Sequence, residues 1–158
     1  MTNLNKEAVE TKKSKFASLE DLFGVNVEDR VRGEEKIQAI NGNRLAIPFK
    51  SITAEEEQNI RKAATKRVKQ PNGQILEVQD EQKYNALLIA TATDETRTDI
   101  RWDSPELAQK VGVPVPSPWL IIPKMLSLGG IVTATQYIIE LSGLGSGSFE
   151  SELEDVKN

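Results

Sequence analysis

The sequence predicts an α+β fold, mainly α, in which an N-terminal β-hairpin packs on a small bundle of about four to five helices. Apolar and polar residues alternate over residues 36–50, with Asn41-Gly42 between the two halves. This pattern is typical of two strands joined by a tight turn. Beyond residue 52, capping residues repeatedly precede apolar residues at helical spacing. A chain of 158 residues has room for one domain with tails.

The chain divides into three predicted parts. Residues 1–35 form a mostly disordered N-terminal lead, because they are polar and without period through Ala17. Within this lead a short helical turn is expected at 18–24, with Leu19, Leu22 and Phe23 on one side as an anchor onto the core or a docking motif. Residues 36–144 form a single folded domain. Residues 145–158, rich in glycine and acids, form a flexible acidic tail.

The first elements of the domain follow from local signals. Pro48 cannot donate to a ladder, so the second strand is an edge or ends there. Thr53 and Glu56 form a capping box that opens a helix through about Lys66. Pro71-Asn72-Gly73 forces a turn, and Ile75 and Val78 could form a second short hairpin with Val68.

Four further helices are expected. One runs from Asp80 to about Thr93 and is apolar nearly all round, so we expect it to be the hub of the core. Ser104-Pro105 opens a short helix that Gly112 closes, and Ser117-Pro118 opens another. The apolar stretch from 119 to 139 could be mistaken for a membrane span, but Pro123 and Gly129-Gly130 divide it, with the last helix following these glycines up to Gly143.

The composition excludes most enzyme chemistry. The chain has no His and no Cys, so it has no Ser-His-Asp or thiolate nucleophile system and no zinc, haem or iron–sulfur site built on those ligands. A Mg²⁺-dependent enzyme could use Asp94, Glu95, Asp99 and Asp103, but their spacing does not match a calcium-binding loop and a solvated loop is favoured. We therefore expect no catalytic residue, no cofactor and no metal site.

The net charge of −4 is unevenly distributed, with a basic middle and an acidic end. The run Arg61, Lys62, Lys66, Arg67 and Lys69 contains no acid. An alternative function is therefore a small nucleic-acid-binding regulatory protein that uses a basic helix over 61–69. A solvated helix face is the favoured interpretation, because Glu55, Glu56 and Glu57 precede the run at distances suited to helix ion pairs.

The segment from 119 to 128 is more apolar than a thin helical domain needs. It is either core or an exposed patch that holds an apolar helical partner. The hypothesis is that part of this segment contacts such a partner, through Trp119, Leu120, Ile122, Leu126 and Leu128.

An ordered set of segments spans about residues 36–144. It consists of Ile47-Pro48-Phe49-Lys50 leading into Thr53-Ala54-Glu55-Glu56, then Lys83-Tyr84-Asn85-Ala86-Leu87-Leu88-Ile89-Ala90, Ser104-Pro105-Glu106-Leu107, Lys124-Met125-Leu126-Ser127-Leu128-Gly129 and Glu140-Leu141-Ser142-Gly143. In this order the segments resemble those of the XkdN-like tail assembly chaperones of long-tailed bacteriophages.

The resemblance implies a non-enzymatic protein that binds the tape measure protein, keeps it soluble and helps recruit tail tube subunits during virion morphogenesis. It further implies that the protein acts in the cytoplasm of the infected bacterial host and is not part of the mature virion. The first 20 residues lack the apolar stretch of a signal peptide, which agrees with that location. We expect that the protein does not bind a membrane and that nucleic acid is not its partner. Self-association of the chain remains possible.

Overall fold

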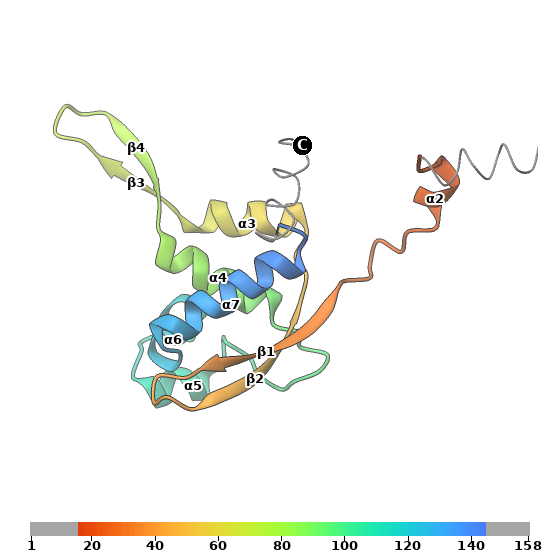
Figure 1. The fold of residues 1–158 in the computed structure, drawn as a ribbon. Coiled ribbons are helices and arrows are strands. Elements are labelled where there is room, and N and C mark those ends of the chain that lie inside the picture. The colour runs from red at the N-terminus through yellow and green to blue at the C-terminus, as the bar shows by residue number, and fades with distance from the viewer. Residues whose placement is uncertain (1–15, 145–158) are drawn as a thin grey trace, which may run out of the picture. The chain divides into compact units, whose positions relative to one another are not determined.

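Six helices and two antiparallel hairpins follow one another between residues 16 and 144, the part of the chain that the computed structural model describes (Figure 1). The predicted α+β, mainly α, class is confirmed. The chain splits into two compact units, Met1–Arg30 and Val31–Asn158. The predicted acidic tail at 145–158 and the first 15 residues of the predicted lead lie outside the described residues.

The described part of the first unit contains one short helix, α2 (Leu19–Phe23). The Ser18 hydroxyl accepts a hydrogen bond from the Asp21 backbone N–H, and the Asp21 carboxylate accepts one from the Ser18 N–H, which closes a capping box. The helical turn predicted at 18–24 is therefore present. Its three apolar side chains, Leu19, Leu22 and Phe23, are exposed.

The second unit begins with a hairpin of β1 (Arg32–Gln38) and β2 (Arg44–Lys50). Its inner face is apolar, and Ile37, Ile47 and Phe49 are fully buried. The strand starts at Arg32, four residues before the predicted start of the domain at residue 36. Residues 32–36 are mostly charged, so the alternation of apolar and polar residues that indicates a strand cannot be recognised there in the sequence.

Helix α7 (Leu128–Leu141) packs on the apolar face of this hairpin. The helix begins before the Gly129-Gly130 pair, because the Ser127 hydroxyl accepts a hydrogen bond from the Gly130 N–H and caps the first turn. The prediction that the last helix follows the two glycines is wrong by one turn. Gly130 lies against the backbone of Gln38, where an added Cβ would overlap the Gln38 carbonyl oxygen.

Helix α3 (Ala54–Ala64) starts at the predicted capping box and ends earlier than expected. Thr65 adopts an extended backbone, and its hydroxyl donates to the Arg61 carbonyl, so the chain leaves the helix there. The residues that follow form β3 (Thr65–Lys69), which pairs with β4 (Ile75–Gln79). The basic helix predicted over 61–69 is therefore wrong, whereas the predicted second hairpin is present.

We call the β3–β4 hairpin, residues 65–79, the arm. It projects away from the helices of its unit (Figure 1). A hydrogen bond from the Asp80 N–H to the Ala64 carbonyl, 2.7 Å long, closes its base. At its tip Gly73 has a φ of 85°, a conformation that glycine adopts without strain.

The remaining helices are α4 (Glu81–Ala92), α5 (Pro105–Val111) and α6 (Pro118–Met125). Helix α4 contacts α3, α6 and α7, and Leu88 and Ile89 lie fully buried between them. The predicted role of this helix as the hub of the core is confirmed. Between residues 16 and 144, no helix is both long and apolar enough to cross a membrane.

Candidate functional site

Burial divides the five residues that were predicted to contact a partner. Ile122 and Leu126 are fully buried, so the structure removes them from any surface. Ile122 belongs to the core cluster, and Leu126 forms a bridge to Ala39 at the end of the first hairpin. Leu120 is half-buried. Trp119 in the first turn of α6 is 39% exposed, and Leu128 at the start of α7 is 80% exposed.

A groove follows the outer face of α4, close to Trp119. Two hollows, with volumes of about 550 and 300 Å³, adjoin each other because Leu87 and Thr91 line both. These two side chains stand one helical turn apart on α4 and are half-buried. They form the middle of the floor of what we call the α4 groove.

Apolar side chains from three other segments wall the α4 groove. Ile60 and Ala63 of α3 line one side. Ile100 and Trp102 of the loop after α4, with Pro118 of α6, line the other side. The Trp102 ring is fixed in place, because its indole N–H donates to the Thr93 hydroxyl over 2.9 Å. Two wall residues, Ile60 and Trp102, are buried members of the core cluster and give the walls fixed support.

The rim of the α4 groove is mainly acidic. Glu56, Glu95 and Asp103 contribute carboxylates, and Arg101 is the one basic side chain among the lining residues. Arg101 forms an ion pair with Glu95, with 2.7 Å between the nitrogen and the oxygen. An apolar floor with an acidic rim suits an amphipathic helix whose apolar face is flanked by basic residues.

Trp119 lies beside this groove, next to Pro118 in the sequence. The Lys83 ammonium group lies 5.0 Å from the centre of the Trp119 ring, which is a cation–π contact between the starts of α4 and α6. Lys83 stands one helical turn before Leu87 on α4. Trp119 itself lines neither hollow, whereas its sequence neighbour Pro118 lines one of them, and the prediction that Trp119 contacts a partner stays a prediction.

A cluster of three side chains fixes α3 against α4 and so sets the width of the groove. Glu57 accepts hydrogen bonds from the Arg61 guanidinium, at 2.6 Å, and from the Tyr84 hydroxyl, at 2.9 Å. Burial and the hydrogen bond to Glu57 raise the pKa of Tyr84 above its ordinary value. Tyr84 therefore stays a neutral donor across the physiological pH range.

The acidic loop that was considered as an enzyme site has a structural role at Asp94. Its buried carboxylate accepts hydrogen bonds from Arg32 at 2.6 Å, from Arg97 at 2.8 Å and from the Thr96 hydroxyl at 2.6 Å. Burial alone would raise the pKa of Asp94, but these hydrogen bonds outweigh it and hold the pKa well below its usual range. We call this cluster the Asp94 lock.

The Asp94 lock joins the loop after α4 to the first hairpin. Arg97 also donates to the backbone carbonyls of Gly33 and Phe49. Both oxygens of the Asp94 carboxylate are used by these partners, and no cluster of three potential metal ligands exists among residues 16–144. The structure thus provides no positive support for the Mg²⁺ hypothesis.

Sequence reasoning missed the residues that line the α4 groove. Leu87 and Thr91 were assigned to a core helix, and Ile100 and Trp102 to a polar loop. One signal for the groove is that α4 is apolar on every side. A small domain has too few elements to pack against all faces of its central helix, so one apolar face stays open to a partner.

A family model described as "Phage XkdN-like tail assembly chaperone protein" matches residues 19–157. No curated protein matches the chain. The crystal structure of the protein yqbn is similar to it, with 18% sequence identity, a TM-score of 0.48 and coverage of 77% of this chain and 93% of that chain.

Proposed function

The chain belongs to the family of XkdN-like phage tail assembly chaperones, as its sequence suggested, and on this premise we propose that it binds the tape measure protein through the α4 groove. By this proposal it keeps that protein soluble and helps to recruit tail tube subunits. It acts in the cytoplasm of the infected host, is absent from the mature virion, and works by binding rather than by catalysis.

The α4 groove is the observation that carries the proposal. Leu87 and Ala90 give its floor apolar surface, Thr91 adds a hydroxyl, and its walls include Ile60 and Trp102 of the core. A groove of this kind accepts the apolar face of a helix by burying residues at positions i, i+3 or i+4, and i+7. Binding of successive helical segments by several copies would cover the apolar surface of a long helical client and prevent its aggregation.

Co-expression with the tape measure protein tests the proposal. The wild-type chain should keep the client in the soluble fraction, and the two should elute together in gel filtration. Thr91→Arg places a long charged side chain where the two hollows meet. We expect this substitution to weaken the complex about tenfold or more, since about 1.4 kcal/mol of lost binding energy suffices.

The matched control is Thr133→Arg, the same substitution at an exposed position of α7. It should leave the complex intact. If both variants bind equally well, or both fail, the groove is not the client site. If the wild-type chain leaves the client insoluble and no complex survives gel filtration, the chaperone function itself is refuted.

A further inference from the structure

The arm has one apolar face that no other element of the described chain covers. Paired residues of an antiparallel hairpin lie on the same face, so the pairs Val68–Leu76 and Lys66–Val78 share one side. Val68, Leu76 and Val78 are 37%, 49% and 40% exposed. A two-stranded hairpin is marginally stable by itself, and an apolar face left in water gives it no support.

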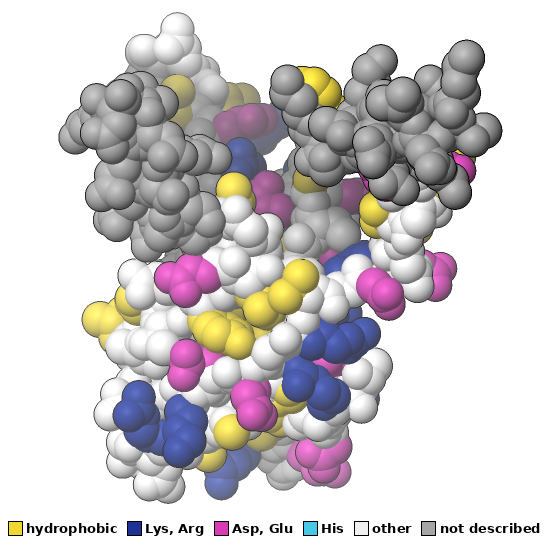
Figure 2. Space-filling model, turned by 45° about the vertical axis from the view of Figure 1, so that its right-hand side comes forward, with side chains coloured by type: hydrophobic (Ala, Val, Ile, Leu, Met, Phe, Trp, Pro, Cys, Tyr) yellow, Lys and Arg dark blue, Asp and Glu magenta, His cyan; other side chains and the backbone are white. Residues whose placement is uncertain are grey.

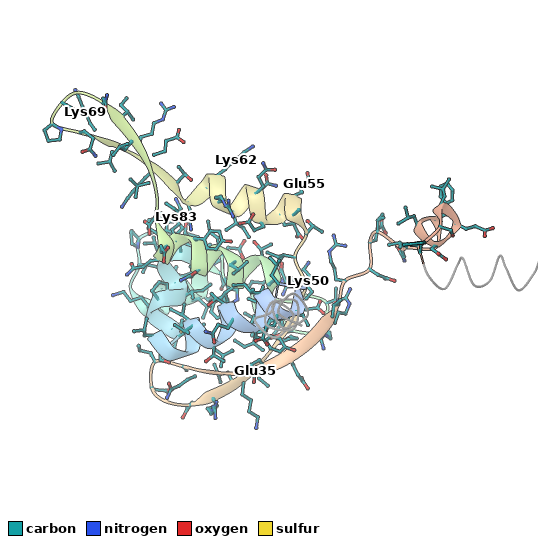
Figure 3. The ribbon with its side chains drawn as sticks, turned by 45° about the horizontal axis from the view of Figure 1, so that its top comes forward. Glu35, Lys50, Glu55, Lys62, Lys69 and Lys83 are labelled. Carbon is teal, nitrogen blue, oxygen red and sulfur yellow. The ribbon has the colours of Figure 1, made fainter. Side chains whose placement is uncertain are left out.

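One basic side chain lies on this face and others lie close to it. Lys66 is on the apolar face, whereas Lys69 pairs with Ile75 on the opposite face, near the tip of the arm (Figure 3). Arg67 forms a long ion pair of 3.8 Å with Glu77, whereas no described residue forms an ion pair with Lys66 or Lys69. Figure 2 shows another part of the surface, where acidic side chains are interspersed with basic and apolar ones. The arm therefore fits a ligand that combines apolar groups with carboxylates.

The sequence of this chain contains such a segment beyond the described residues. Residues 149–156 read Phe-Glu-Ser-Glu-Leu-Glu-Asp-Val, which is four acids with three apolar residues. The residues before it, 145–148, are Gly-Ser-Gly-Ser and carry no charge. We call residues 149–156 the acidic segment.

The acidic segment starts close enough to reach the arm. The end of α7 is held at the start of α3, because the Ile52 N–H donates to the Ser142 hydroxyl over 3.0 Å. Helix α3 has 11 residues and is thus about 16 Å long, and the arm begins where it ends. The five steps along the chain from Leu144 to Phe149 span up to about 17 Å, so Phe149 can reach the base of the arm.

Charge also orders the path along α3. Glu55 lies at the start of this helix, Lys62 near its end, and Lys69 beyond it in the arm (Figure 3). The uncharged residues 145–148 would pass the acidic first turn, and the first carboxylate, Glu150, would arrive beside the basic half. If the basic residues stood at the start of α3 and the acids at its end, the carboxylates of the acidic segment would be repelled from the arm.

From this complementarity we infer that the acidic segment docks on the apolar face of the arm within the same chain. Phe149, Leu153 and Val156 cover Val68, Leu76 and Val78. The carboxylates pair with Lys66 on the same face and are attracted by the charge of Lys69 on the other side of the strand. The inference concerns the chain by itself and does not depend on the identity of the client. It assigns to the arm an occupant distinct from that of the α4 groove.

Hydrogen exchange of backbone amides in the full-length chain tests the inference. Neutralising the segment with Glu150→Gln, Glu152→Gln, Glu154→Gln and Asp155→Asn should speed exchange in residues 66–69 and 75–79 by about 3- to 10-fold, as expected for losing the attraction between exposed charges. Leu153→Ser should have a similar effect through the apolar contacts. The amides of β1 and β2 serve as the internal reference and should not change.

Two controls decide between occupants. Asp99→Asn with Glu106→Gln neutralises exposed acids elsewhere and should leave the arm unchanged. Lys66→Glu with Lys69→Glu should expose the arm, and adding Glu150→Lys and Glu154→Lys should restore its protection. Unchanged exchange in every segment variant overturns the inference. It is also overturned if protection rises with protein concentration, which indicates a second copy, or if only a random DNA duplex at low salt protects the arm.

Discussion

The two hairpins of this chain share one local design and differ in what covers them. Each pairs two strands antiparallel around a turn with a positive-φ glycine, Gly42 in the first and Gly73 in the arm. The first hairpin buries Ile37, Ile47 and Phe49 under α7, whereas every residue of β4 is exposed.

The difference teaches that turn and strand signals in the sequence decide whether a hairpin forms. Packing against other elements decides how much the hairpin contributes to the stability of the fold. The first hairpin is held by α7 on its inner face and by the Asp94 lock at one end. Within residues 16–144, the arm is held at its base by the hydrogen bond from Asp80 to Ala64, and no other element packs on its apolar face. Substitutions should therefore act on global stability in the first hairpin and on binding or local opening in the arm.

The largest expected contrast compares the same substitution in both hairpins. Ile47→Ala empties a fully buried site in β2 and should lower the free energy of unfolding by about 3–4 kcal/mol. Ile75→Ala removes a side chain of β4 that is 58% exposed and should cost at most about 0.5 kcal/mol. Urea unfolding of both variants measures these values. Equal losses would show that the arm is part of the core.

A second contrast sharpens the role of α7 as the cover of the first hairpin. Gly130→Ala forces a Cβ into the Gln38 carbonyl and should destabilise the chain by about 2–3 kcal/mol. Gly129→Ala, one residue earlier, meets only the end of the Gln38 side chain and should be neutral or stabilise the helix by up to about 1 kcal/mol. Thermal unfolding distinguishes them, and a harmless Gly130→Ala would refute the close approach.

A smaller effect is expected at the Asp94 lock. Asp94→Asn removes the buried carboxylate but leaves Arg32 and Arg97 partly exposed, where water can solvate them. The cost should therefore be about 2 kcal/mol at neutral pH, less than for a fully buried ion pair. The measurement is urea unfolding of wild type and variant between pH 7 and pH 3.

The pH dependence has a defined sign. The pKa of Asp94 in the folded chain lies below that in the unfolded chain, so its stabilisation is fully present above about pH 4 to 5. It is lost as the pH falls further towards the folded pKa. The advantage of wild type over Asp94→Asn should shrink over that range, and a constant difference would contradict the assigned charge.

The parts of the fold that depend on neighbouring residues could be predicted from the sequence. The caps at Ser18, Thr53, Asp80 and Ser104 begin helices where they were expected, because each cap forms within three residues of its partner. The family was also identifiable from the order of these segments. The end of α3 could not be predicted, because the basic residues that follow Ala64 are as compatible with a helix as with a strand. The helix ends because Thr65 adopts an extended backbone.

The candidate site was less predictable, because it depends on distant packing. The apolar segment at 119–128 gave no sign that Ile122 would be buried while Trp119 stays partly exposed beside a groove. That groove exists only because α3, α4 and the loop around Trp102 meet in the folded chain. The site to which the acidic segment would dock likewise requires knowing which face of the arm is uncovered.

The contacts between the first hairpin and the last helix set an order of events during synthesis. Gln38 and Ser127 are bonded across 89 residues, and Ile52 and Ser142 across 90. At about 5–20 residues per second, the ribosome completes α7 roughly 5 to 20 s after the hairpin. During that interval α7 cannot cover the apolar face of the hairpin, so a newly made chain exposes Ile37, Ile47 and Phe49 until its last helix has been synthesised.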